Sequence, residues 1–183
     1  MTPVAIGFAG RIGAGKSSAS SALAATLGWP RASFGSLVRT IAAERGLDVS
    51  RETLQAIGEG LEAADPIGFC RAVLSSVDWQ PGTPVVIDGI RHVRILQILK
   101  DLILPIPFFF VYLEAPAELR RSRVVSRGDF NSSRIGEVEA HSTERDVVGV
   151  LQKMADLTIT SDLGSAEVLV AHLRDHLERR FSR

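Results

Sequence analysis

The 183-residue sequence has little cysteine, little lysine and no excess charge of either sign. Cys70 is the single cysteine, which excludes an internal disulfide and, with no histidine or cysteine pair near it, argues against a structural zinc site. We expect Cys70 to be a small buried hydrophobe. Basic and acidic residues balance at 21 each, so the global charge favours neither a nucleic-acid nor an anionic-membrane partner. Lysine occurs only at Lys16, Lys100 and Lys153.

The sequence also lacks a hydrophobic run long enough to cross a bilayer. The most apolar stretch, residues 102–113, is short and contains Pro105 and Pro107. The N-terminus reads Met-Thr-Pro-Val-Ala-Ile and has no basic start of the kind that precedes a secretory signal. We therefore expect a cytoplasmic protein with no membrane partner.

Apolar strands and helices alternate along the chain, with no internal repeat and no linker. Nearly continuous apolar runs are typical of strands buried on both faces of a parallel sheet. The sequence thus predicts one α/β domain over residues 1–183, with a five-stranded parallel sheet and helices on both faces. The expected strands cover residues 4–9, 31–34, 84–88, 108–113 and 157–160. The expected helices cover residues 16–27, 37–45, 51–62, 66–77, 93–101, 118–127, 141–154 and 165–181.

Residues 10–17, Gly-Arg-Ile-Gly-Ala-Gly-Lys-Ser, match the complete phosphate-binding loop pattern between an expected strand and an expected helix. Glycines let backbone N–H groups turn toward phosphates, and the helix N-terminus adds positive potential. Lys16 is expected to reach the β- and γ-phosphates of ATP, and the Ser17 hydroxyl to bind Mg²⁺. The residues predicted to hold the nucleotide are Gly10, Gly13, Ala14, Gly15, Lys16, Ser17 and Ser18.

Two expected strands end in an acidic residue. Asp88 follows Val85, Val86 and Ile87 at the carboxyl end of a strand, where ligands bind in open α/β sheets. We expect Asp88 to hold Mg²⁺ through water or to orient the attacking oxygen, with a turn aspartate before Gly89 as the alternative. Glu114 ends a later strand, and there we favour a charge at the start of a loop.

Several arginines lie beside elements that converge on the strand ends. Arg120, Arg123 and Arg127 have i, i+3, i+7 spacing and would place three guanidinium groups on one helix face, which suits phosphate. The alternative is a solvated helix face. Arg91 follows Asp88-Gly89-Ile90 and is expected near the nucleotide.

The remaining candidates have simpler interpretations. His172 and His176 are i, i+4 on the last expected helix, but no acidic or cysteine partner is evident, so we expect a surface face rather than a metal site. His92 and His141 are expected to be structural hydrogen-bonding residues. For Phe69 and Trp79 we favour core packing over lining an acceptor site.

With these motifs the chain resembles the small P-loop nucleotide kinases, which include nucleoside monophosphate kinases and dephospho-CoA kinase. Residues 33–39, Ser-Phe-Gly-Ser-Leu-Val-Arg, are similar to the adenylate-kinase segment in which an arginine grips the acceptor phosphate. Arg39 takes that arginine's place, although Ser36 stands where an aspartate is usual. Residues 86–91 are similar to an Asp-Gly-x-Arg segment of these kinases, and the resemblance implies that Arg91 also binds acceptor phosphate.

Two later segments extend the resemblance. Residues 120–127 are similar to the arginine helix that leads into the lid, which would span residues 120–146. Residues 143–146, Thr-Glu-Arg-Asp, followed by Ala-Asp-Leu-Thr-Ile at 155–159, resemble the end of dephospho-CoA-kinase-like proteins. Residues 37–77 would form the acceptor-binding helical segment.

The resemblance implies a P-loop NTPase fold and an ATP- and Mg²⁺-dependent kinase with a small phosphate-bearing acceptor, foremost a (deoxy)nucleoside monophosphate. Lys16, Asp88, Arg120, Arg123 and Arg127 would be catalytic, and Arg39 and Arg91 would bind the acceptor. The alternatives are a dephospho-CoA kinase-like activity and a nucleotide-dependent switch or ATPase. The sequence leaves the acceptor and the oligomeric state open.

Overall fold

The computed structural model describes residues 2–126, 147–161 and 166–181 of the chain. Its strands are β1 Ala5–Gly10, β2 Arg31–Ser33, β3 Val85–Asp88, β4 Phe108–Glu114 and β5 Leu157–Thr160. Its helices are α1 Lys16–Leu27, α2 Phe34–Glu44, α3 Arg51–Ala64, α4 Pro66–Ser75, α5 Val93–Ile103, α6 Ala117–Ser126, η2 Val147–Leu151, η3 Gln152–Met154 and α9 Ala166–Phe181.

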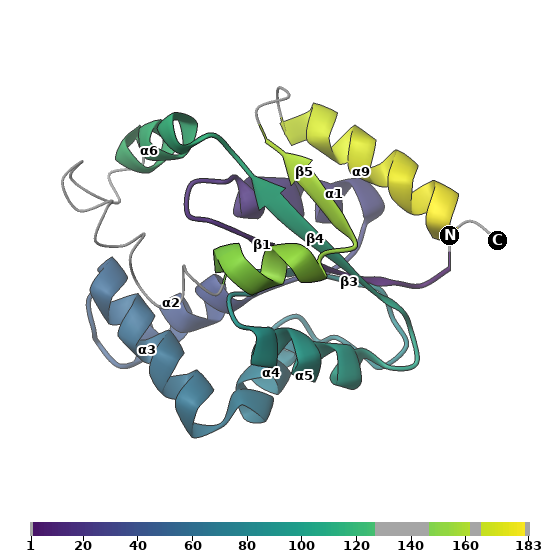
Figure 1. Cartoon of the computed structure of the whole chain (residues 1–183). Coiled ribbons are helices and arrows are strands. Elements are labelled where there is room, and N and C mark those ends of the chain that lie inside the picture. Colours follow the sequence, from purple (N-terminus) through teal and green to yellow (C-terminus); the bar gives the residue numbers. More distant parts are fainter. Residues whose placement is uncertain (1, 127–146, 162–165, 182–183) are drawn as a thin grey trace.

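The five strands form one parallel sheet in the order β2-β3-β1-β4-β5 (Figure 1). Strand β1 lies in the middle, pairing Ala5 with Val85 of β3 on one side and with Phe108 of β4 on the other. All six residues of β1 are buried, as its unbroken apolar run requires. The predicted fold class, a five-stranded parallel sheet covered by helices, is confirmed.

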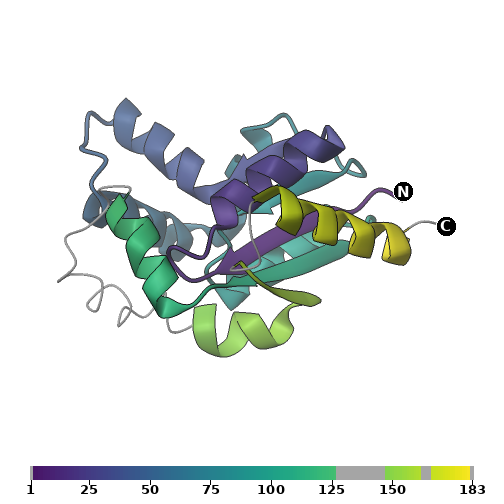
Figure 2. The same cartoon turned by 90° about the horizontal axis from the view of Figure 1, so that it is seen from above.

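Helices cover both faces of the sheet, as Figures 1 and 2 show. Alternate side chains of each strand point to opposite faces. Ile6 and Phe8 of β1 pack in a cluster with residues of α1 and α9, whereas Ala5 and Ala9 pack in a cluster with residues of α2, α4 and α5. The small alanines let the second group of helices approach the sheet closely. The alternation of side chains along each strand therefore determines which strand residues face which layer of helices.

Most expected elements are confirmed to within three residues at each end. Helix α2 begins at Phe34 rather than at residue 37, because the Ser33 hydroxyl accepts a hydrogen bond from Ser36 N–H and caps the helix there. The helix expected over residues 141–154 is different: residues 147–154 form a π-helical turn followed by a 3₁₀ turn. Three valines and Gly149 within this segment have low helix propensity. Residues 141–146 lie outside the described part of the chain.

The two ends of the described chain meet beside α9 (Figure 1). Thr2 N–H donates to the carbonyl of Phe181 at 2.9 Å. Asp156, just before β5, accepts from Phe110 N–H at 2.9 Å and from Arg180 at 3.1 Å, which ties α9 to the sheet. None of the helices in the described residues combines the length and apolar character that a membrane span needs.

Candidate functional site

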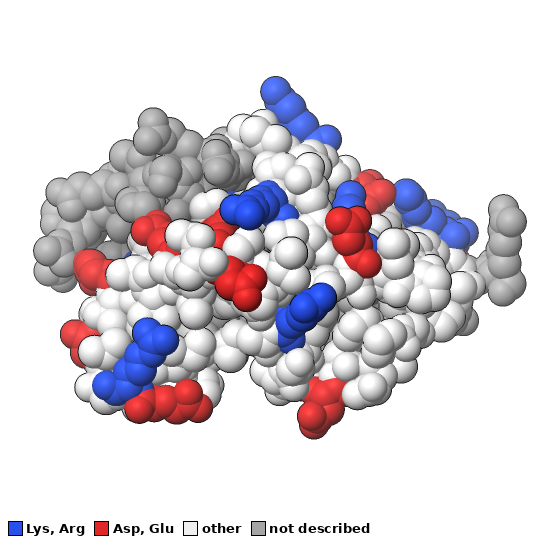
Figure 3. Space-filling view, turned by 90° about the horizontal axis from the view of Figure 1, so that it is seen from below, with Lys and Arg blue, Asp and Glu red and all other residues white. Residues whose placement is uncertain are grey.

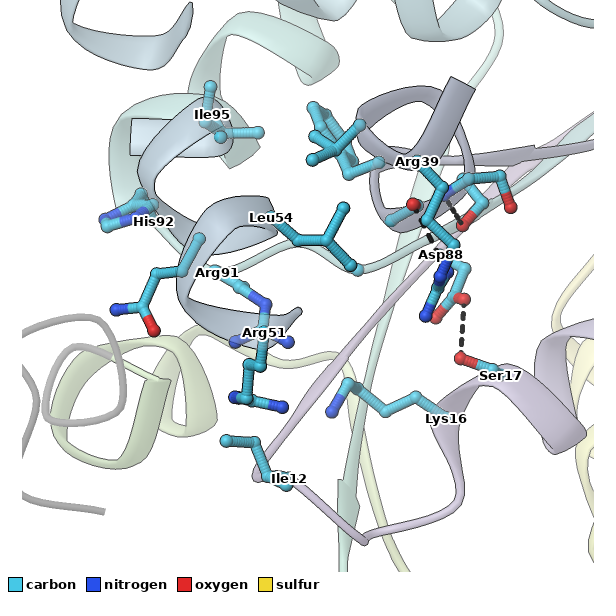
Figure 4. Close-up of a pocket in the computed structure, with 18 of the residues that line it drawn as sticks. Ile12, Lys16, Ser17, Arg39, Arg51, Leu54, Asp88, Arg91, His92 and Ile95 are labelled. Carbon is cyan, nitrogen blue, oxygen red and sulfur yellow. Dashed lines mark hydrogen bonds between the residues drawn. The ribbon is translucent and has the colours of Figure 1, made fainter. Parts of the chain in front are cut away.

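A cavity of about 800 Å³ opens where strands β1, β2 and β3 end. One wall is the loop after β1 with the start of α1, and the opposite wall comes from α2 and α3. The segment after β3 closes the cavity between them (Figure 4). Ligands bind at this edge in open α/β sheets, so the fold places a cavity where the sequence motifs converge.

The loop after β1 has the backbone of a phosphate cradle. Gly10, Gly13 and Gly15 have φ angles of 142°, 77° and 92°, a region that side chains other than glycine disfavour. A Cβ atom on Gly13 would lie 2.5 Å from the carbonyl oxygen of Arg120. Ala14 between them is fully buried. The glycines are therefore required by the curvature of the loop and by its contact with α6.

Lys16 and Ser17 begin α1 and project toward the cavity (Figure 4). The Lys16 ammonium donates to the carbonyls of Gly10 at 2.6 Å and Arg11 at 2.9 Å, and the residue is 9% exposed. Gly15 caps the helix in the left-handed region without a side chain, which leaves the helix N-terminus open to the cavity. Ser18 lies beside them and also lines the cavity. The partial positive charge of the helix N-terminus and the buried Lys16 ammonium thus lie at the same wall of the cavity.

Asp88 ends β3 and is 3% exposed. Its Oδ2 accepts hydrogen bonds from the Ser17 hydroxyl at 2.9 Å and from the Arg31 guanidinium at 2.5 Å. Arg31 Nε also donates to the hydroxyl of Ser20 on α1 at 2.8 Å. We name these residues the Asp88 brace: Ser17, Ser20, Arg31 and Asp88. The brace joins β2, β3 and α1 at the base of the cavity.

The second oxygen of Asp88 marks a site that fits a divalent cation. Oδ1 is buried and has no hydrogen-bond partner among the described residues. With the Ser17 hydroxyl it forms an all-oxygen donor set of the kind that Mg²⁺ prefers. The described residues contain no cluster of three histidine, cysteine or acidic side chains that would hold a metal alone. A cation held by Asp88 and Ser17 would take its remaining ligands from water or from a bound molecule.

Arginines from three elements line the opposite part of the cavity (Figure 4). Arg39 of α2 donates to the carbonyl of Gly35 at 3.2 Å, Arg51 opens α3, and Arg91 follows β3. The predicted acceptor residues Arg39 and Arg91 therefore lie on the same cavity as the phosphate loop. These arginines bring positive charge to the cavity that could hold a second anion.

Two arginines of helix α6, Arg120 and Arg123, contact the phosphate loop instead of lining the cavity. Arg120, 4% exposed, donates to the carbonyls of Ala115 at 3.2 Å and Ile12 at 3.4 Å. Arg123 donates to Gly13 O at 3.3 Å and to the Ser161 hydroxyl at 2.8 Å. The two guanidinium groups hold the outer side of the loop. Arg127 lies outside the described residues.

Three features of the site were missed by sequence reasoning. Arg31 follows an unremarkable turn, and only the pairing of β2 with β3 brings it to Asp88. Arg51 occupies the first turn of α3, where an arginine is usually a surface residue. Glu62 of α3 was not singled out, although it lies 2.9 Å from His92, which was expected near the site as a structural hydrogen-bonding residue. An acidic residue opposite a loop histidine leaves no signal in the sequence, because the two are far apart along the chain.

Four further residues singled out in the sequence have simple structural roles. Cys70 is fully buried, and burial together with Glu62 raises the pKa of its thiol to about 12, as suits an inert core residue. Glu114 accepts from the Gln152 amide. Phe69 packs in the core and also lines the cavity, while Trp79 packs against the core and donates to the carbonyl of Thr83.

On the face seen in Figure 3, the described acidic and basic side chains are interspersed, and we see no large patch of one sign among them.

A parallel sheet in this order, with a glycine loop after its central strand and a lysine and serine on the next helix, defines the P-loop kinase fold. Solved structures share it. The APS kinase CysC of Mycobacterium tuberculosis, in complex with AMPPNP and APS, has a TM-score of 0.64 at 18% identity, covering 97% of this chain and 98% of that one. Shikimate kinase from Acinetobacter baumannii has a TM-score of 0.61 at 18% identity, covering 100% and 97%.

The chain belongs to the AAA domain family, whose model matches residues 6–144. A UPF0200/UPF0201 protein of Archaeoglobus fulgidus is 32% identical over 179 residues, which cover 94% of this chain. The match covers 54% of that relative, so the chain spans about half of its length.

Proposed function

We propose that this chain is an ATP-dependent phosphotransferase that moves the γ-phosphate to a small phosphate-bearing acceptor, foremost a (deoxy)nucleoside monophosphate. One observation carries the proposal: a single cavity joins the phosphate loop to a second wall that bears Arg39, Arg51 and Arg91. A protein that only binds or hydrolyses ATP needs the loop but not the second anion site. Two phosphate sites on one cavity support transfer between two ligands.

The donor side follows from the loop. Backbone N–H groups of residues 10–18 and the N-terminus of α1 would hold the phosphates of ATP, and Lys16 would leave the carbonyls of Gly10 and Arg11 to bind the β- and γ-phosphates. Ser17 and Asp88 would hold Mg²⁺, directly or through water, and the bound ion would offset the charge of the phosphates.

The acceptor side follows from the arginines. Arg39 and Arg91, joined by Arg51, would hold the acceptor phosphate so that its attacking oxygen faces the γ-phosphate. Such catalysis depends on positioning and on neutralising charge, and closing the cavity excludes water as a competing acceptor. Arg120, Arg123 and Arg127 would offset charge on the transferred group. For Arg120 and Arg123 this requires exchanging a loop carbonyl for phosphate.

Two other functions share parts of this site. A dephospho-CoA kinase-like activity would use the same loop with a larger acceptor, and the segments at 143–146 and 155–159 are the feature that favours it. A nucleotide-dependent switch or ATPase would use the loop alone. The arginines of the second wall favour transfer over the switch.

A coupled ADP-release assay across a panel of acceptors tests the proposal. The panel contains the common ribo- and deoxyribonucleoside monophosphates and dephospho-CoA, each with MgATP. We expect ATP consumption to depend on one class of acceptor and a phosphorylated product to appear by mass spectrometry. ATP turnover that no acceptor stimulates would contradict the kinase and favour the switch or ATPase.

A further inference from the structure

Helix α3 contains two glycines that differ in what surrounds them. Gly58 lines the cavity, and a Cβ atom built on it would meet only Val38 Cγ2, at 3.8 Å. Gly60 is exposed and does not line the cavity, and nothing lies within 4 Å of a Cβ atom on it. Neither glycine has a positive φ angle, so their backbone would accept other residues. The two positions form a matched pair that differs in access to the cavity.

Glycine at these positions weakens the helix. In a helix interior glycine is the poorest residue after proline, because it gives up the most backbone freedom on folding. Helix α3 offsets this only in part, since Ile57 is its one buried residue among fourteen and Leu54 and Leu61 are partly buried against the core. Neither strain nor crowding explains Gly58. What it provides is room beside the second wall of the cavity.

The cavity that Gly58 lines also has apolar walls. Val38, Leu54, Phe69 and Ile95 line this cavity, with Val38 beside Gly58, and Phe69 packs edge-on against Phe34 with ring centroids 5.0 Å apart. A phosphate or a bare sugar would gain little from such walls, because its hydroxyl and oxyanion groups would lose water without gaining partners. Apolar walls suit the faces of an aromatic ring instead.

Polar side chains stand close to the same room. Gln55 of α3 lines the cavity and donates to Glu59 at 3.1 Å, and the ion pair of Glu62 with His92 lies further along the same helix. A ring with apolar faces and a polar edge matches this arrangement. The three arginines then lie at the phosphate end of such a molecule (Figure 4).

We infer that Gly58 is a specificity-determining residue, which leaves the space that the planar ring of the acceptor occupies. This inference rests on the proposed function, because it assigns a role within the acceptor side of that cavity. It predicts that the acceptor is a nucleotide or a molecule with a similar flat ring, not a sugar phosphate. It also predicts that a larger side chain at position 58 stabilises helix α3 and impairs binding of the acceptor.

The test uses four variants of the full chain: Gly58→Ala, Gly58→Leu, Gly60→Ala and Gly60→Leu. For each variant we would measure kcat and KM for the best nucleotide acceptor, the dissociation constant of MgATP and the melting temperature. Ribose 5-phosphate serves as the acceptor that has a phosphate and a sugar but no planar aromatic ring. Each alanine variant should melt about 2–4 °C above the parent, the usual gain from a helical Gly→Ala change in a chain of this size.

Only at Gly58 do we expect a substitution to raise stability and at the same time to impair use of the acceptor. Gly58→Ala should lower kcat/KM for the nucleotide about tenfold, and Gly58→Leu should lower it further, with unchanged MgATP affinity. Gly60→Ala and Gly60→Leu should leave kcat/KM within about twofold of the parent. An equal loss of kcat/KM at both glycines, or no loss in Gly58→Leu, would overturn the role of Gly58 without contradicting the proposed kinase activity. Preferred use of ribose 5-phosphate by the parent would also overturn it, whereas no stimulation by any acceptor would refute the kinase itself.

Discussion

The two walls of the cavity are built differently. The wall proposed to bind the donor, the donor wall, is one continuous segment, the loop after β1 and helix α1, and five of the twelve residues of α1 are buried. The wall proposed to bind the acceptor, the acceptor wall, is assembled from α2, α3 and the segment after β3, and α3 buries one residue of fourteen. The donor wall is anchored in the sheet, and the acceptor wall is held mainly by contacts between helices.

This difference in anchoring predicts a difference in behaviour. Elements with few buried contacts open at lower free energy than the core, and binding segments are often drawn from them. The backbone of the donor wall should therefore keep its geometry with or without ligand, although side chains such as Lys16 exchange partners. The acceptor wall should adjust when an acceptor binds. Five variants would sharpen or break this contrast.

The largest effect is expected from Lys16→Ala. The Lys16 ammonium is the buried cation of the donor wall, so removing it should lower activity by about 10³-fold while the melting temperature changes little. Lys100→Ala on α5, away from the cavity, is the control. Steady-state kinetics with a thermal melt checks the prediction. Unchanged ATP affinity and turnover in Lys16→Ala would refute the assignment of the donor wall.

The next effect concerns the Asp88 brace. Arg31→Ala should cost about 3 kcal/mol of stability, because it leaves the buried carboxylate of Asp88 without its charged partner. The control is Arg180→Ala, whose pair with Asp156 is much more exposed and should be worth under about 1 kcal/mol. Denaturant unfolding of both variants measures the difference. Similar costs would mean that the donor wall does not depend on the brace.

A kinetic effect of intermediate size is expected on the acceptor wall. Arg39→Ala and Arg91→Ala should each raise the KM of the acceptor by about 10–100-fold, since each removes a charge-assisted bond to phosphate. The affinity for MgATP should not change. Arg94→Ala, on an exposed position of α5, is the matched control. A parallel loss of MgATP affinity would show that the two walls are not separate sites.

The smallest effect is expected at the start of α3. The hydroxyls of Thr53 and Ser50 donate to Asp48 and hold the pKa of that carboxyl below its ordinary value of 3.8. A lowered pKa stabilises the fold above the ordinary value, and this contribution is lost as the pH falls through the lowered one. Asp48→Asn should therefore melt slightly below the parent at neutral pH. A difference that persists in strong acid would contradict the assignment.

The sequence predicted the donor wall better than the acceptor wall for a physical reason. Gly10 to Ser17 are neighbours in the chain, and their chemistry requires a fixed spacing that can be read directly. The sheet was predicted because strands buried on both faces are continuously apolar. Arg31 and Arg51 were missed because their roles depend on which strands pair and how α3 packs. The spacing of Arg120, Arg123 and Arg127 could be read from the sequence, but the contacts of Arg120 and Arg123 with the loop carbonyls could not.

The central place of β1 in the sheet has a consequence for how the molecule unfolds. The strand that carries the phosphate loop is hydrogen-bonded to β3 and to β4, so it can be released only when the sheet itself comes apart. Backbone amides of β1 should be the slowest to exchange with solvent, and those of α3 among the fastest. A ligand held by the loop then protects the whole sheet by mass action, while α3 remains free to fray and re-form around whatever enters beside it.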